Sequence, residues 1–140
     1  MNGARNLADA VLRCELDRAE WTHEAHITFS MEMVRRRGAV EALGITRTAI
    51  CRYNEASGVA NTDNAGYHET LTVYFSFAVA HLLDTGLDLA SIIEHPLVAR
   101  HAPLLAWERS VLFSGEARRS WIEPHSPLPF PVTVCDGSPL

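Results

Sequence analysis

The sequence predicts an all-α protein, a single-domain helical bundle with a proline-rich C-terminal extension. Apolar residues recur at spacings of three and four along most of the chain instead of alternating, which is the period of amphipathic helices. A chain of 140 residues has the size of one domain and can bury a core without disulfides or metal. We therefore assign residues 1–122 to the helical domain and residues 123–140, where prolines are too dense for a helix, to the tail.

Capping residues and the positions of Gly and Pro predict where each helix begins and ends. Thr22 is a good N-cap for a helix that runs to the arginines before Gly38, and Asp88 caps a short helix that Pro96 stops. Residues 57–66 are rich in Gly, Asn and Asp, and they predict a loop. Ser114 caps the last helix. The expected helices are residues 4–16, 22–37, 45–55, 67–83, 88–94, 97–111 and 114–122.

Charge and cysteine content exclude several classes of protein. A net charge of −5 argues against nucleic acid as a partner, because phosphate binding depends on neutralisation by Lys and Arg. Cys14, Cys51 and Cys135 are odd in number and lack CxxC spacing, which is typical of reduced thiols in a cytoplasm. The chain has neither a membrane-spanning run nor a signal peptide, so we expect a cytoplasmic protein, with homo-oligomerisation left open.

The expected second helix carries two histidines, three residues apart, on its apolar side. At about 100° per residue, His23, His26 and Ser30 fall among the apolar side chains and not among the charged ones. Residues at i and i+3 are neighbours on a helix surface, so both imidazoles can converge on one point. We expect this polar trio (His23, His26, Ser30) to face the interior or a cavity that opens into it.

The expected fourth helix begins with the sequence YHET, residues 67–70. Glu69 is explained by the helix dipole, which stabilises an acid in the first turn by about 0.3–1 kcal/mol. His68 has no such explanation, because histidine is not a preferred first-turn residue. The YHET segment is therefore a candidate for the wall opposite the polar trio.

Together these residues predict a metal site. Imidazole suits zinc, iron, copper and nickel, and histidines with a carboxylate and open positions suit catalytic zinc or Fe(II). The expected ligands of one divalent transition metal are His23, His26, His68 and Glu69, with Glu69 and Tyr67 as candidate catalytic residues. The i, i+3 spacing is weaker evidence than the i, i+4 spacing of HExxH, so we do not identify a zincin.

Polar residues around the loop are candidates for contacts with a substrate. Asn54 ends the third helix, and Asn61 and Thr62 lie in the loop that leads directly to His68. Loops between rigid helices often carry function, although turn formation explains these residues equally well. The candidate substrate-binding residues are Asn54, Asn61, Thr62, Thr70 and Ser30.

Three segments resemble a family of small uncharacterised bacterial proteins. They are WTHEAHITFS, RYNEASGVANTDNAGYHETLT and VLFSGEARRSWIEPHSPLPF, which together extend over about residues 21–130. The resemblance implies no activity. It implies that certain polar residues belong to the family pattern: His23, His26, Asn54, Asn61, Thr62, Tyr67, His68, Glu69 and Thr70.

Three functions remain open at this point. The leading hypothesis is a small helical metalloprotein, an enzyme that acts on a small-molecule substrate with metal-activated water, dioxygen or carbonyl. The second is a metal-free pocket in which His68 and Glu69 do acid–base chemistry on a bound acid or carbonyl compound, or which only binds a small molecule. The third is a non-catalytic assembly protein whose histidines form a structural network in the core.

Overall fold

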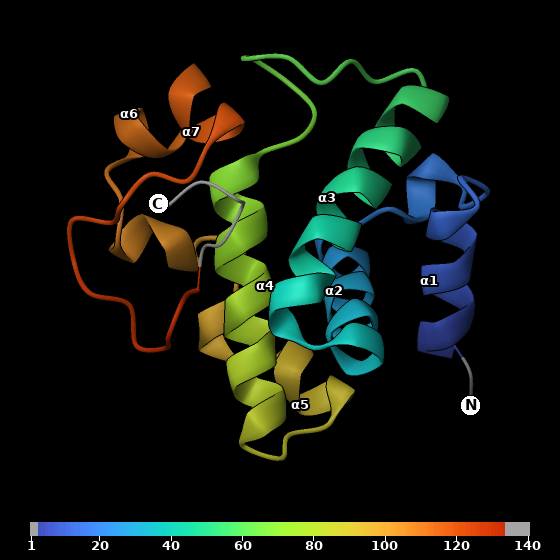
Figure 1. Cartoon of the computed structure of the whole chain (residues 1–140), viewed down its shortest axis with the longest axis horizontal. Helices are drawn as coiled ribbons and strands as arrows, with labels where there is room; N and C mark the ends of the chain where they lie inside the picture. Colours follow the sequence, from blue (N-terminus) through green and yellow to red (C-terminus); the bar gives the residue numbers. More distant parts are fainter. Residues whose placement is uncertain (1–2, 134–140) are drawn as a thin grey trace.

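The computed structural model describes residues 3–133, and within this range it contains helices but no strand (Figure 1). The all-α class predicted from the sequence is confirmed. Cys135 and the last residues of the proline-rich tail lie outside the described range. The α-helices are α1 (Gly3–Leu12), α2 (His23–Arg37), α3 (Ala39–Ala56), α4 (Glu69–Asp84), α5 (Leu89–Ile93), α6 (Arg109–Leu112) and α7 (Gly115–Arg119), and the 3₁₀ helices are η1 (Arg18–Glu20), η2 (Pro96–Val98) and η3 (Ala102–Leu105).

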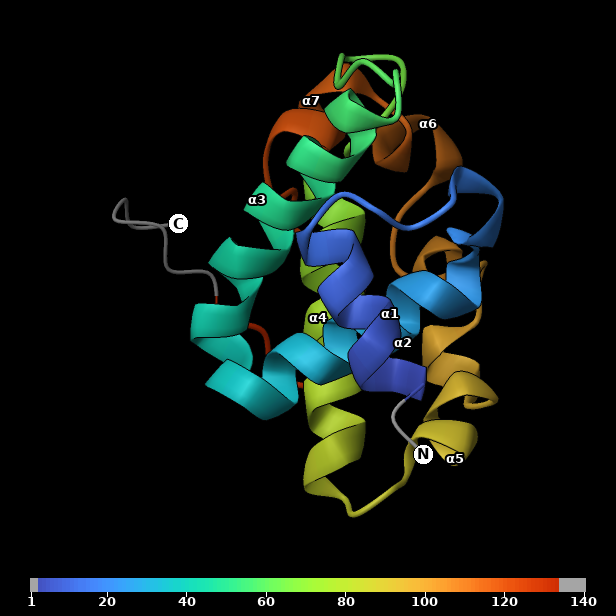
Figure 2. The ribbon, with the colours of Figure 1, turned by 90° about the vertical axis from the view of Figure 1, so that its right-hand side faces the viewer.

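Helix α4 is the centre of the fold. It packs against α2 and α3 on one side and against η2 and α7 on the other, and α1 covers α2 and α3 from outside (Figures 1 and 2). Its sequence is apolar on nearly every face, as expected for a helix enclosed by neighbours. The loop of residues 57–67 crosses one end of the bundle from α3 to α4 (Figure 1).

Helix α2 joins the two apolar clusters that form the core. Ile27 and Met31 pack in the cluster around α4, whereas Phe29 and Met33 pack in the cluster between α1 and α3. Thr28 and Glu32 belong to the polar side of the wheel, yet both residues are buried. The reason is that α1, α3, α4 and α5 enclose this helix on several sides. A wheel detects the apolar side of a helix, but it does not show how many neighbours the helix has.

Several predicted caps are present. The side-chain oxygens of Thr22, Asp88 and Ser114 accept backbone N–H bonds from the first turns of α2, α5 and α7. Gly38, at φ +80°, ends α2 as expected. The predicted gap after Gly38 is wrong, because α3 begins at Ala39 and Gly38 serves both helices.

Three other predicted helices differ from the structure: one is replaced by shorter elements, and two are shorter, of which the last ends at Arg119 instead of residue 122. The prediction of one helix over residues 97–111 is wrong. This segment contains η2, η3 and α6, with Ala99 in an extended conformation between η2 and η3. Pro103 lacks the N–H that a continuous helix would donate to Ala99, and its ring would clash there. The first helix ends at Leu12 instead of near residue 16, because Cys14 adopts a positive φ of 58°. No helix within residues 3–133 combines the length and the apolar character that crossing a membrane requires.

Candidate functional site

A cavity of about 580 Å³ opens between α2, the C-terminal end of α3, the N-terminal end of α4 and the segment of residues 100–118. We call it the central cavity. It brings together most of the polar residues that the sequence singles out, along with several that it does not. The lining residues are Arg18, Trp21, Thr22, His23, His26, Ser30, Ile50, Asn54, Val59, Gly66, Tyr67, His68, Leu71, Thr72, Phe75, Arg100, His101, Leu104, Arg109, Leu112, Phe113 and Arg118.

The polar trio of α2 lines this cavity, so its predicted inward orientation is present in the structure. The Nε2 atom of His23 donates to the backbone oxygen of Val98 at 2.8 Å, and its ring meets Phe75 edge-on. Ser30 is 7% exposed, and within residues 3–133 its hydroxyl has no hydrogen-bond partner. Helix α2 therefore presents an ordered polar strip to the cavity.

His26 lies against the indole of Trp21, with ring centroids 3.8 Å apart and planes 30° from parallel. Burial, followed by electrostatic repulsion from His23, Arg18 and Arg100, lowers the pKa of His26 to about 3. The imidazole is therefore neutral at physiological pH. Arg18 and Arg100 are therefore close enough to His26 to affect its pKa.

His68 has a structural role that its sequence position does not reveal. It is the N-cap of α4: its Nδ1 accepts the backbone N–H of Leu71 at 3.2 Å, and its Nε2 donates to the backbone oxygen of Leu112 at 2.7 Å. Burial lowers its pKa, which favours the neutral ring that this arrangement needs. The sequence argument that His68 lacks a structural explanation is wrong, since both ring nitrogens already have partners.

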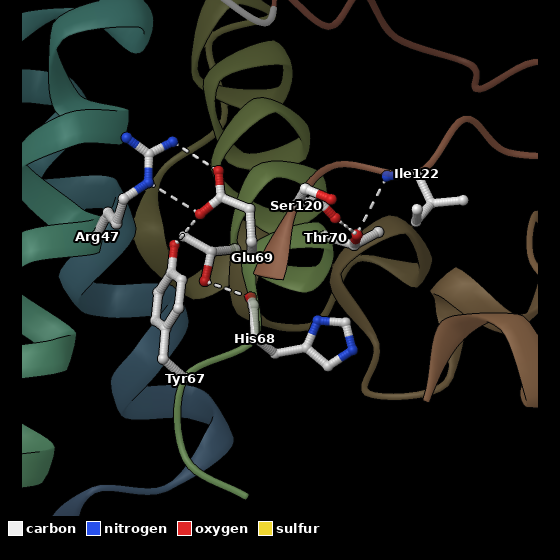
Figure 3. Close-up of polar contacts among 8 residues, drawn as sticks. Arg47, Tyr67, His68, Glu69, Thr70, Ser120 and Ile122 are labelled. Carbon is white, nitrogen blue, oxygen red and sulfur yellow. Dashed lines mark hydrogen bonds and ion pairs between the residues drawn. The ribbon is translucent and has the colours of Figure 1, made fainter. Parts of the chain in front are cut away.

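Glu69 is not among the residues that line the central cavity, and it forms an ion pair with Arg47 of α3 (Figure 3). Two of the three guanidinium nitrogens of Arg47 donate to the two carboxylate oxygens, with Nε 2.9 Å from Oε1, and the Tyr67 hydroxyl donates to Oε1 at 2.6 Å. The paired carboxylate raises the pKa of Arg47, and burial beside Glu69 raises the pKa of Tyr67. Glu69 therefore joins α3 to α4, and Tyr67, which is one of the lining residues of the cavity, donates its hydroxyl to this pair.

The asparagines around the loop hold it in shape. The Oδ1 atom of Asn61 accepts from Asn54 at 3.0 Å and from the backbone N–H of Tyr67 at 2.9 Å, while its Nδ2 donates to the carbonyl of Cys51 at 3.1 Å. Asn54 also accepts from Arg18 at 2.8 Å, and it alone of the two asparagines lines the cavity. Turn formation thus accounts for Asn61, and the chain of bonds connects the loop to Arg18.

Thr62 and Thr70 also lie outside the lining of the central cavity. Thr62 is exposed, and its hydroxyl accepts from the backbone N–H of Asn64 within the turn. The hydroxyl of Thr70 donates to the carbonyl of Ser120 at 2.8 Å and accepts from the N–H of Ile122 at 3.3 Å (Figure 3). Thr70 therefore attaches the segment after α7 to the central helix.

Five basic residues of the cavity are absent from the candidates that the sequence provides. Two of them contact neighbouring groups of the protein: Arg118 donates to the carbonyls of Gly66 and Tyr67, and the guanidinium of Arg109 lies 5.7 Å from the ring centroid of Phe113. All five basic residues are scattered along the chain without a motif, so no spacing rule could group them. The five are Arg18, Arg100, His101, Arg109 and Arg118.

The four expected metal ligands do not form one cluster. Within the part of the chain that the structure describes, no group of three or more His, Cys, Asp or Glu residues is placed to hold a metal ion. His23 and His26 share the cavity, whereas Glu69 is paired with Arg47. Cys14 and Cys51 are free thiols, as expected.

No protein-family model, curated protein or solved structure matches the chain. The resemblance to small uncharacterised bacterial proteins therefore stays a prediction. The function has to be argued from the central cavity itself.

Proposed function

We propose that this protein binds a small organic anion in the central cavity. The observation that carries the proposal is the charge of the lining: Arg18, Arg100, Arg109 and Arg118 contribute to it, and no aspartate or glutamate does. The chain as a whole has 17 acidic and 12 basic residues, and a net charge of −5. A cavity that collects arginines and excludes carboxylates in an acidic protein favours an anionic occupant.

The positive charge of the lining is not neutralised by the protein. None of these four arginines forms an ion pair within residues 3–133, whereas Arg13, Arg36, Arg37, Arg47 and Arg119 do. Burial is the main cause of the lowered pKa of His26, and the charged groups that lower it further, His23, Arg18 and Arg100, are all basic residues. Guanidinium groups match carboxylate and phosphate groups geometrically, so either can be the anion.

The remainder of the lining favours an organic ligand. Leu71, Phe75, Leu104 and Phe113 are among the apolar and aromatic residues that cover the walls between the cations. The volume of about 580 Å³ lies within the range of about 300–1,000 Å³ that is typical of small-molecule pockets. An aromatic or branched aliphatic acid suits these dimensions better than an inorganic ion.

His26 is better suited to binding than to proton transfer. A general base works best when its pKa is near the operating pH, and the pKa of His26 is about 3. Both ring nitrogens of His68 already have hydrogen-bond partners, and Glu69 does not line the cavity. These observations support a binding role more strongly than the acid–base mechanism that the sequence suggests.

Thermal unfolding with matched ligands tests the proposal. Benzoate and phenyl phosphate should raise the Tm, whereas the neutral benzamide should not. A ligand at ten times its Kd stabilises by about 1.4 kcal/mol, which corresponds to about 4–5 °C for a domain of this size. Arg100→Ala should reduce the shift, and Arg35→Ala, which removes an exposed arginine of α2 outside the cavity, should not. Equal shifts with the neutral and the anionic ligands would contradict the proposal.

A second candidate is the transition-metal site that the sequence predicts. The observation that favours it is His23, whose Nε2 is held by the carbonyl of Val98 while Nδ1 has no partner within residues 3–133. Metal-bound histidines commonly fix one nitrogen in this way. Of the four ligands expected from the sequence, His23 and His26 are the two that such a metal site in the central cavity would keep. Stoichiometric zinc, iron, copper or nickel in purified protein, lost in His23→Gln, would support it.

A further inference from the structure

We propose that the anion in the central cavity also carries a hydrogen-bond donor, a hydroxyl or amide N–H, which the polar trio of α2 accepts. This inference rests on the proposed function, since it describes the same ligand more closely. It names the ligand class as hydroxylated or amidated organic acids. The evidence is the hydrogen-bond state of the polar atoms that line the cavity.

His23 has a defined tautomer. Its Nε2 is 2.8 Å from the backbone oxygen of Val98, and a carbonyl oxygen can only accept, so the proton is on Nε2. The Nδ1 atom of the neutral ring is then a bare acceptor. Because Nδ1 has no partner within residues 3–133, an acceptor of fixed identity remains available on this residue, which lines the cavity.

His26 and Ser30 are also available. Neither side chain has a hydrogen-bond partner among the described residues, and both line the cavity. The unpartnered side-chain atoms that are sealed from solvent in that range are Thr46 Oγ1 and Ser76 Oγ, so the nitrogens of His26 and the hydroxyl of Ser30 remain accessible. The ring of His26 is fixed against Trp21, which sets the direction of its nitrogens.

Other polar side chains of the cavity have commitments elsewhere. His68 uses both ring nitrogens, the Tyr67 hydroxyl donates to Glu69, and Asn54 is bonded to Arg18 and Asn61. Apart from the exposed His101, the available acceptors are thus concentrated on α2, while the arginines supply donors only. An acid without a donor would displace water from the trio and leave its acceptors unpaired, which costs affinity.

Paired titrations by isothermal calorimetry at pH 8 test the inference. At this pH the imidazole of His26, whose pKa is lowered to about 3 by burial, is neutral. Benzoate is compared with 3- and 4-hydroxybenzoate, and phenylacetate with 4-hydroxyphenylacetate. We expect at least one hydroxylated acid to bind roughly five- to tenfold more tightly than its parent, the range of one neutral hydrogen bond.

Variants assign the preference to the trio. In the double variant His26→Phe/Ser30→Ala the preference should fall, because two of the three acceptors are removed and only Nδ1 of His23 remains. The readout is the ratio of the two affinities within one variant, and phenylalanine keeps an aromatic ring beside Trp21. The control is His81→Phe, a partly buried histidine outside the cavity that lies near the ring of Phe130. It should retain the preference. Circular dichroism of each variant shows that the fold is intact.

The results distinguish a failure of the proposed function from a failure of the inference about the donor. If no acid of the series binds, the proposed function fails. If the acids bind but no hydroxylated member exceeds its parent, the proposed function stands and the inference about the donor is overturned. If the preference is unchanged in His26→Phe/Ser30→Ala, these two side chains do not bind the donor and their role in the inference is overturned.

Discussion

Removing Arg47 should destabilise the protein without weakening ligand binding. In Arg47→Met the carboxylate of Glu69, whose side chain is 10% exposed, loses its ionic partner and keeps the Tyr67 hydroxyl. Breaking a fully buried ion pair costs about 3–5 kcal/mol. The Arg47 side chain is 36% exposed, so solvent screening reduces the expected loss to about 2–3 kcal/mol. For a domain of this size that is a fall in Tm of about 6–12 °C.

Urea unfolding followed by circular dichroism measures this loss. The variants Arg47→Met and Glu69→Gln and the double variant form a double-mutant cycle, in which the double variant should be more stable than the sum of the two losses predicts. Benzoate affinity should be unchanged in all three, since neither residue lines the central cavity. The reasoning is refuted if Arg47→Met is as stable as the wild type, or if Glu69→Gln abolishes ligand binding at unchanged stability.

Three further predictions concern stability. His26 is protonated near pH 6.5 in the unfolded chain and near pH 3 in the folded protein, so its contribution to the free energy of unfolding is complete above pH 6.5 and falls below it. Between pH 8 and pH 5 the wild type should lose about 2 kcal/mol more stability than His26→Gln. Equal losses in parallel urea titrations would mean that His26 is solvated. Gly66→Ala places a Cβ 2.4 Å from the oxygen of Ala60, whereas the Cβ of Gly58→Ala meets open space at a similar positive φ. Gly66→Ala should therefore lower the free energy of unfolding by at least about 2 kcal/mol and Gly58→Ala by about 1 kcal/mol. Equal melting temperatures of the two variants would contradict this. Thr70→Val leaves two backbone partners unpaired and should cost about 1–3 kcal/mol in the same assay, which an unchanged midpoint would disprove.

Local patterns predicted the helices well wherever a cap or a glycine marked an end. Thr22, Gly38 and Asp88 act as expected, because capping depends on side chains within a few residues. The helix expected over residues 97–111 failed where Pro103 interrupts the apolar periodicity. The apolar spacing in this segment is that of a helix, but the missing N–H of Pro103 prevents a continuous one.

The candidate site was predicted in part. The polar trio of α2 lines a cavity, as its position among apolar residues indicates. Glu69 and His68 instead have structural partners, Arg47 and the backbone of Leu112, which lie 22 and 44 residues away in the chain. Pairings between distant segments have no local signal in one sequence. The arginines of the cavity were missed for the same reason, since only the fold brings them together.

Calorimetric titration with phenyl phosphate tests the central claim most directly. Binding should be measurable with the wild type, about five- to tenfold weaker in Arg100→Ala, and unchanged in Arg35→Ala. The magnitude is that of one charge-assisted contact, reduced for the exposure of Arg100. If the wild type binds neither phenyl phosphate nor benzoate, or if the two arginine variants bind equally well, the central cavity is not an anion site.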